Sequence, residues 1–271
     1  MAKISIMTMV FGGELERGDL TDAGLLAALE ATGYDGVELN AGRLLSAASR
    51  VDACETYLAD SRLEVTCLDV GCNLIGADQA ARDEGIAALR AGLELAARLG
   101  SPISLAAGSR LSGEISPEDG RRMTADGLEA CMAEARELGV TVAIEDFGVA
   151  PTLQCAAADC LEILDAVPGL AFVFDTGNFY FAGEDPERNM ERLAGRTRHV
   201  HLKDWIKSET PQIADVSGAP LGQGIIPNEA LVRRFVEAGL VDSFSVELGA
   251  PGDRLEAARA DLETVRGWLR E

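Results

Sequence analysis

The sequence predicts a single (β/α)8 barrel in which short apolar strands alternate with longer amphipathic helices. The first observation is a repeated join, in which a helix ends and a strand follows at Gly33, Gly100, Gly139 and Gly239. Glycine just past a helix end is typical of a left-handed C-terminal cap. The second is the spacing of the apolar runs, mostly about 30 to 40 residues, as a strand with its crossover helix requires. A doubly wound sheet gives a similar local pattern, but eight such units fill a barrel.

Eight strands are expected, each from a short run of apolar residues rich in β-branched or aromatic side chains. They are expected to end near Met9, Leu39, Asp69, Ala106, Glu145, Asp175, Leu202 and Glu247. The segments between them are expected to form the outer helices, and the last of these runs from Asp253 to Arg270. The longest insertion, 205–227, follows the seventh strand and carries several Pro and Gly residues, which makes it a candidate lid.

Length and composition limit the classes of protein to consider. The 271 residues are 47% hydrophobic and contain no linker-like stretch, so we expect one domain over residues 1–271. The formal net charge of −21 disfavours binding to nucleic acids and to anionic lipid surfaces. Neither a leader-like start nor a membrane-length apolar run is present, which predicts a cytoplasmic protein. The six cysteines lack C-x-x-C spacing and are expected to be free, buried thiols.

Polar side chains stand at the expected ends of four strands. The chain has only two histidines, His199 and His201, and strand alternation places them on one face. Three other strands end in a carboxylate, at Glu145, Asp175 and Glu247. Strand ends converge in a barrel, and buried carboxylates cost several kcal/mol unless paired or metal-bound. One imidazole, that of His201, and three carboxylates therefore predict a divalent-metal site, with His199 one step deeper in a supporting role.

The ordered motifs Glu145, Asp175-Thr-Gly-Asn178, His201-Leu-Lys203-Asp204 and Glu247 resemble the xylose-isomerase-like TIM-barrel superfamily, most closely its sugar phosphate isomerase/epimerase group. The resemblance covers nearly the whole chain. It implies a metal site formed by Glu145, Asp175, His201 and Glu247. It also implies Mn²⁺ or Mg²⁺ as the cofactor, with Co²⁺ and Zn²⁺ as alternatives. Glu145 and Glu247 would form the acid/base pair of a carbohydrate isomerase or epimerase.

The chemistry explains why such an enzyme needs two glutamates. Removing a proton next to a carbonyl creates an enediolate, whose charge a chelating metal stabilises. If Glu145 and Glu247 act on opposite faces of one carbon, the centre is epimerised, whereas return of the proton to the adjacent carbon gives aldose–ketose isomerisation. A metal-dependent lyase or dehydratase is the alternative, through inosose-type dehydration or keto-glycoside cleavage, because it shares the first deprotonation.

Two further classes are less compatible with the sequence. An apurinic endonuclease on this barrel needs several histidines for three zinc ions and a basic surface for DNA, and the chain has two histidines and a charge of −21. A barrel that only binds a sugar has little reason to keep both acid/base glutamates. We therefore expect a small-molecule carbohydrate as the partner, and a homo-oligomer, dimer or tetramer, as in many relatives.

Four side chains are expected to bind substrate. Asn178 follows the metal Asp by three residues, where many relatives carry a histidine. Lys203 shares a strand face with His201, and its ammonium would contact a substrate oxygen or pair with Glu247. Asp204 would then point elsewhere and form a supporting hydrogen bond.

The other two lie earlier in the chain. Glu38, near the end of the second strand, resembles a recurrent acidic residue of the superfamily and would contact substrate hydroxyls or the His201 imidazole. Arg110 falls on the loop after the fourth strand and would read a polar end of the substrate. Few other basic residues lie near these strand ends, which favours a neutral sugar or glycoside.

Overall fold

The computed structural model describes residues 2–249 and 252–270. Its eight main strands are parallel and follow one another in the order β1-β10-β7-β6-β5-β4-β3-β2 of a closed barrel, which confirms the predicted fold class. These strands are β1 (Lys3–Met7), β2 (Gly36–Asn40), β3 (Glu64–Gly71), β4 (Ile103–Ala107), β5 (Thr141–Glu145), β6 (Ala171–Asp175), β7 (Thr197–Leu202) and β10 (Ser243–Val246). Each ends within two residues of its predicted end.

Helices separate the strands, as the alternating pattern predicts. The α-helices are α1 (Gly12–Arg17), α2 (Asp22–Thr32), α3 (Ala41–Leu45), α4 (Ala48–Asp60), α5 (Gln79–Leu99), α6 (Pro117–Leu138), α7 (Pro151–Gln154), α8 (Ala157–Ala166), α9 (Pro186–Leu193), α10 (Asn228–Glu237) and α11 (Arg254–Arg270). Two 3-10 helices complete the set, η1 (Thr8–Phe11) and η2 (Asn178–Ala182). Because η1 follows directly, the first strand ends at Met7 instead of near Met9.

The predicted glycines are present at the ends of α2, α5, α6 and α10. Gly33, Gly100 and Gly139 cap α2, α5 and α6 with φ values of 107°, 72° and 70°. Gly239 lies one residue past the C-cap of α10 and has a φ of 60°. A β-carbon is unfavourable at positive φ, so glycine is the residue that ends each helix and redirects the chain into the next strand.

The chain divides into two compact units, which are described separately. Unit 1 consists of residues 1–66 and 199–271, and unit 2 of residues 67–198. In unit 1, β1 pairs with both β10 and β2, and β10 pairs with β7. Tyr34, just before β2, donates a hydrogen bond from its buried hydroxyl to Ala258 O in α11, which ties this helix to the unit. The register of β10 with β7 places Ser245 beside His201.

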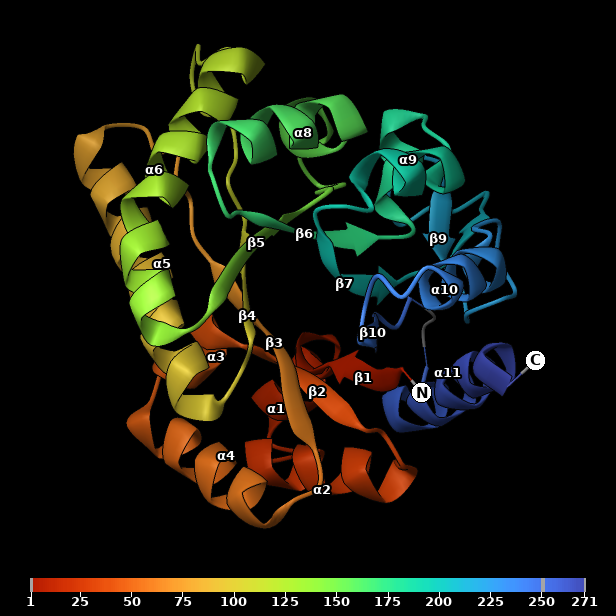
Figure 1. The fold of residues 1–271 in the computed structure, drawn as a ribbon. Helices are drawn as coiled ribbons and strands as arrows, with labels where there is room; N and C mark the ends of the chain where they lie inside the picture. Colours follow the sequence, from red (N-terminus) through yellow and green to blue (C-terminus); the bar gives the residue numbers. More distant parts are fainter. Residues whose placement is uncertain (1, 250–251, 271) are drawn as a thin grey trace. The chain divides into compact units, whose positions relative to one another are not determined.

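Unit 2 contains most of β3 together with β4, β5 and β6. These strands pair in chain order, with α5 and α6 packed side by side (Figure 1). One face of the sheet is apolar and forms the cluster Cys67, Ile103, Leu105, Ala143, Ala171 and Val173. Strand alternation puts Glu145 on the face of Ala143, and Asp175 on that of Val173. Both carboxylates therefore stand above an apolar core at the C-terminal ends of their strands.

The insertion after β7 contains regular structure of its own. Strands β8 (Trp205–Lys207) and β9 (Val216–Gly218) pair antiparallel, with Trp205 opposite Gly218. A hairpin thus occupies the segment that the sequence identified as a candidate lid, and whether it moves stays a prediction.

Two other expectations can be compared with the described residues. All six cysteines are free and buried, as predicted. Among residues 2–249 and 252–270, no helix combines the length and apolar character needed to span a bilayer.

Candidate active site

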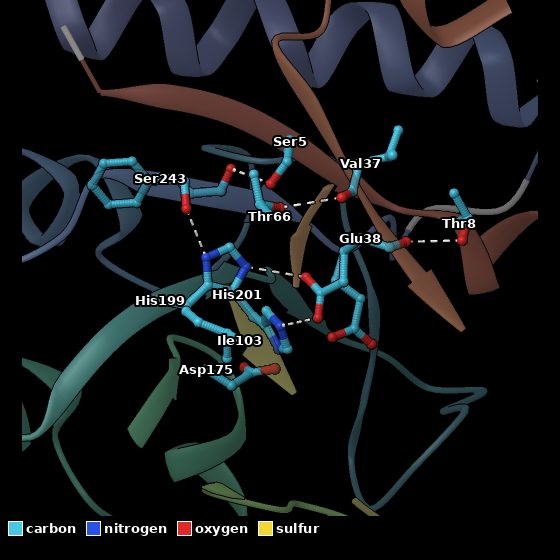
Figure 2. A network of polar contacts seen from close by, with 12 residues as sticks. Ser5, Thr8, Val37, Glu38, Thr66, Ile103, Asp175, His199, His201 and Ser243 are labelled. Carbon is cyan, nitrogen blue, oxygen red and sulfur yellow. Dashed lines mark hydrogen bonds and ion pairs between the residues drawn. The ribbon is translucent and has the colours of Figure 1, made fainter. Parts of the chain in front are cut away.

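A hydrogen-bond network on the C-terminal half of β2 and β7 defines the polar centre of unit 1. Glu38 is fully buried, and its two carboxylate oxygens contact two imidazoles. His201 Nε2 lies 2.9 Å from Oε1, and His199 Nε2 lies 3.1 Å from Oε2. On its other side, His199 Nδ1 is 2.9 Å from Ser243 Oγ (Figure 2). Both histidines contact the same carboxylate, so the prediction that they share one strand face is confirmed.

Charge and burial together determine the protonation states in this network. Burial favours the protonated form of Glu38, but the neighbouring His201 and His199 lower the pKa of this carboxyl well below its ordinary value. Burial lowers the pKa of His199, against the opposing influence of Glu38, so its ring is neutral. An ionised carboxylate only accepts hydrogen bonds, so each Nε2 carries the proton it donates to Glu38. His199 Nδ1 then accepts the hydroxyl proton of Ser243, and the basic nitrogen of His201 is Nδ1.

Glu38 therefore takes the second of the two roles that the sequence allowed, because both of its oxygens bind imidazoles. Contact between Glu38 and substrate stays a prediction. His199 has the supporting role expected of it, because it holds Glu38 in place from the deeper side. The carboxylate fixes the ring orientation and tautomer of His201, which is how a carboxylate commonly prepares a histidine for metal binding.

A second pair of predicted residues meets just beyond β7 and β10. Lys203 Nζ lies 2.8 Å from Glu247 Oε2, and their side chains are 12% and 23% exposed. The backbone N–H of Glu247 donates to Leu202 O at 3.0 Å. The ammonium also lies 5.7 Å from the ring centroid of Trp205, within range of a cation–π contact. The pairing of Lys203 with Glu247 is confirmed, and it limits how that carboxylate can turn.

In unit 2, β5 and β6 end in the two predicted carboxylate ligands. Glu145 is 7% exposed and Asp175 is fully buried. Asp175 Oδ1 accepts the backbone N–H groups of Gly177 and Asn178 at 2.8 and 3.0 Å. These hydrogen bonds explain the Asp-Thr-Gly-Asn sequence, because an Asp side chain that binds backbone N–H groups two and three residues later stabilises a turn directly after the strand.

Asp146 is a third buried carboxylate in the same place, and the sequence analysis did not identify it. Its Oδ1 accepts the backbone N–H of Asp175 at 2.8 Å. Burial first, and then the charges of Asp175 and Glu145, raise the pKa of Asp146 well above its ordinary value. The sequence does show Asp146 as a second acidic residue directly after a buried strand. Its role could not be predicted from that position, because it depends on the hydrogen bond with Asp175 of β6.

The remaining two predicted substrate-binding residues lie in loops of unit 2. Asn178 is 5% exposed at the start of η2, and a β-carbon on Gly148 would lie 2.8 Å from its Oδ1. A side chain at position 148 would thus displace the Asn178 amide. Arg110 is exposed, and its backbone N–H donates to Asn73 Oδ1 at 3.4 Å. Substrate contacts by Asn178 and Arg110 stay predictions.

The arrangement of strand-end carboxylates and imidazole on this barrel agrees with a known family of proteins. The family model described as the xylose isomerase-like TIM barrel matches residues 26–271. The chain belongs to this family. The resemblance found in the motifs of strands β5 to β7 and in Glu247 is therefore confirmed at the level of the family.

Individual members of the xylose isomerase-like family are only distantly similar. Inosose dehydratase from Lacticaseibacillus casei is 25% identical over 113 residues, which is 40% of this chain and 38% of that protein. The chain thus matches well under half the length of this relative. The structure of 3-keto-D-glucoside 4-epimerase, YcjR, from E. coli superposes with a TM-score of 0.79 at 17% identity, covering 98% of this chain and all of that one. The IOLI protein with a bound zinc atom gives a TM-score of 0.80 at 20% identity, covering 98% of each chain.

The dehydratase and the epimerase are enzymes by name, and the structure of the IOLI protein contains a zinc atom. At these identities the solved structures establish the fold alone. Within the family fold, the four predicted ligands divide equally between the units. Glu145 and Asp175 belong to unit 2, and His201 and Glu247 to unit 1. Their donor atoms are carboxylate oxygens and one imidazole nitrogen, a set that fits a hard or borderline divalent cation.

Proposed function

We propose that the chain is a divalent-metal-dependent sugar isomerase or epimerase that acts on a small ketose or sugar derivative by proton transfer. The observation that carries this proposal is the placement of Glu145, Asp175, His201 and Glu247. The first three lie on the C-terminal ends of β5, β6 and β7, and the fourth directly follows β10. In (β/α)8 enzymes this end of the barrel carries the catalytic groups.

These four residues would hold the cation, with Mn²⁺ or Mg²⁺ as the metal and Co²⁺ or Zn²⁺ as alternatives. His201 would contribute Nδ1, because Glu38 accepts the proton on Nε2 at 2.9 Å. When bound, such a cation stabilises negative charge on the oxygens of a carbonyl substrate by several kcal/mol. The carboxylates of unit 2 support this assignment, since burial and their mutual repulsion favour a nearby positive charge.

The proton transfers are assigned to the two glutamates. Glu145 removes the proton next to the carbonyl, and Glu247 returns a proton from the other side, with the roles reversed in the opposite direction. Lys203 orients Glu247 through the 2.8 Å contact. Return of the proton to the same carbon inverts that centre, and return to the neighbouring carbon moves the carbonyl. The partner implied is a small carbohydrate, and the protein is expected to act in the cytoplasm, as a dimer or tetramer.

A dehydratase is the second candidate function, favoured by the sequence similarity to inosose dehydratase. The reaction begins with the same proton removal by a glutamate. It then expels the hydroxyl of the β-carbon, which takes up a proton from a carboxyl group and leaves as water, so the product has one hydroxyl fewer than the substrate. Keto-glycoside cleavage follows the same course with an alcohol as the leaving group.

The two functions differ in whether the substrate keeps every hydroxyl while deuterium from solvent enters at carbon. The protein would be treated with EDTA, reloaded with Mn²⁺ and incubated in D₂O with D-fructose, D-tagatose, a 3-keto-glucoside and an inosose. An isomerase or epimerase incorporates deuterium at carbon and keeps every hydroxyl, which NMR and mass spectrometry detect. Loss of water or of the aglycone would refute the leading proposal and establish the second one.

Substitution of either glutamate tests the assigned proton transfers. Glu145→Gln and Glu247→Gln should each lower turnover by about 10²- to 10⁴-fold, because glutamine cannot accept the proton. Glu237→Gln, on the exposed side of α10, is the matched control and should retain wild-type turnover. Turnover that survives in both active-site variants would exclude these roles.

A further inference from the structure

The segment after β7 is held at both ends by one buried side chain. Asp204 is the second residue after β7 and is fully buried. Its Oδ1 accepts the backbone N–H groups of Trp205 and Ile226 at 2.9 and 3.1 Å. Its Oδ2 accepts those of Gly222 and Gly224 at 2.9 and 3.0 Å. A single carboxylate thus connects the first residue of the segment to its last turn.

The backbone around Asp204 strengthens this connection. Asp204 O accepts the N–H of Ala219 at 3.0 Å, and Trp205 O accepts that of Ile225 at 2.8 Å. A β-carbon at position 224 would lie 2.1 Å from Asp204 Oδ1, so the approach of the chain to the carboxylate requires glycine. Residues 205–226 are therefore built around Asp204.

The same segment presses against the residues that follow β10. A β-carbon on Gly218, the last residue of β9, would lie 2.1 Å from Gly249 O. A β-carbon on Gly249 would in turn lie 2.9 Å from Gly218 Cα. The two backbones are in direct contact, so a displacement of the hairpin would displace 247–249, the segment that begins with Glu247.

We propose that Asp204 is a positioning residue that holds segment 205–226 against residues 247–249 and thereby fixes the Glu247 carboxylate. The backbone contact of Gly218 with Gly249 limits the movement of residues 247–249. Lys203, next to Asp204 in the chain, also holds Glu247 through its ion pair. The catalytic consequence rests on the proposed function of Glu247, whereas the structural coupling does not.

The test is Asp204→Asn, which keeps the shape of the side chain but replaces one acceptor oxygen with an NH₂ group. That group faces two backbone N–H donors, so two of the four hydrogen bonds are lost whichever way the amide turns. Asp215→Asn is the matched control, because Asp215 lies in the same segment, is exposed and pairs with Lys207 at the surface. Hydrogen–deuterium exchange of the metal-free proteins measures the effect at each backbone amide.

For Asp204→Asn, we expect exchange to accelerate by about tenfold or more in both 205–226 and 247–249, with the helices of unit 2 unchanged. The Kd for Mn²⁺ alone, measured by calorimetry below the melting temperature, should rise about 10- to 100-fold, as for loss of a residue that supports a ligand. Asp215→Asn should match the wild type in both measurements. Faster exchange confined to 205–226, with 247–249 and the Mn²⁺ Kd unchanged, would overturn the proposal.

A second variant covers the case in which Asp204→Asn does not fold. Gly218→Ala forces the hairpin away from Gly249 and leaves the Asp204 carboxylate intact. It should accelerate exchange at 247–249 and weaken Mn²⁺ binding, while the amides of Gly222, Gly224 and Ile226 stay protected. Unchanged exchange at 247–249 would refute the coupling. A wild-type protein that binds no Mn²⁺ would contradict the proposed function, while the exchange data would still decide the role of Asp204.

Discussion

The two units compensate their buried carboxylates in different ways. In unit 1, Glu38 receives hydrogen bonds from two imidazoles, and Asp204 receives them from four backbone N–H groups. In unit 2, burial and the nearby charges of Asp175 and Glu145 together raise the pKa of Asp146. The interior beneath them is apolar and consists of Cys67, Ile103, Leu105, Ala143, Ala171 and Val173.

This difference indicates a division of labour within the barrel. The histidine network of unit 1 satisfies the Glu38 carboxylate internally, so it can fix the orientation of His201 without a ligand. Unit 2 places three buried carboxyl groups together above an apolar core, an arrangement that a bound cation would stabilise. Unit 1 thus orients the imidazole of the proposed ligand His201, and unit 2 contains the proposed carboxylate ligands Glu145 and Asp175.

The largest effect on stability is expected at Glu38, because both of its buried carboxylate oxygens accept a hydrogen bond from an imidazole. Glu38→Gln replaces an acceptor by an NH₂ donor that faces an imidazole N–H. We expect the free energy of unfolding of the EDTA-treated protein to fall by about 3 to 5 kcal/mol, as for breaking a buried charged contact. Chemical denaturation measures it. Glu64→Gln is the control, because Glu64 is 59% exposed and pairs with Lys3 at the surface. Equal stability of the two variants would show that the contacts of Glu38 with the imidazoles do not stabilise the fold.

An intermediate effect is expected at Asp261, a buried carboxylate of unit 1 that accepts a hydrogen bond from Leu221 N. Burial raises the pKa of Asp261 to about 6; the hydrogen bond from Leu221 N opposes this shift, and the charge of Asp204 adds to it. The folded protein therefore holds this proton more tightly than the unfolded chain, so stability falls as pH rises from about 4 to 6. A shift of about two units corresponds to roughly 3 kcal/mol.

Asp261→Asn should remove this loss while keeping an acceptor for Leu221. The stability of the variant relative to wild type should rise between pH 4 and pH 6 and then level off, as measured by urea denaturation across that range. Parallel stability curves for the two proteins would show that the pKa of Asp261 is not raised in the folded protein, and would contradict the assignment.

The smallest effect is expected at the edge of the histidine network. Ser243→Ala removes the hydroxyl that donates to His199 Nδ1 at 2.9 Å and should cost about 1 kcal/mol. Ser245→Ala is the matched control on the same strand, since Ser245 Oγ is buried with no hydrogen-bond partner among the described residues. Its loss should be neutral or slightly stabilising. If thermal denaturation shows the same loss for both serines, the network does not extend to Ser243.

The barrel and its strand ends were predictable because the signals that specify them are local. The alternation of apolar residues and the glycine caps at Gly33, Gly100 and Gly139 depend only on neighbours in the chain. The same local logic placed Glu145 and Asp175 at strand ends. It did not identify Asp146 or Ser243, whose roles depend on the pairing of β5 with β6 and on the approach of β10 to His199.

By itself, the sequence determined the fold class, the positions of the strand ends and the residue types that stand there. Only the tertiary structure decided which partner each of those residues has. Glu38 could have faced substrate or imidazole, and Asp204 had no assigned partner until the turns of 205–226 were seen to close around it. The physical reason is that strand position follows from short-range periodicity, whereas a hydrogen bond between residues far apart in sequence depends on register and on backbone approach.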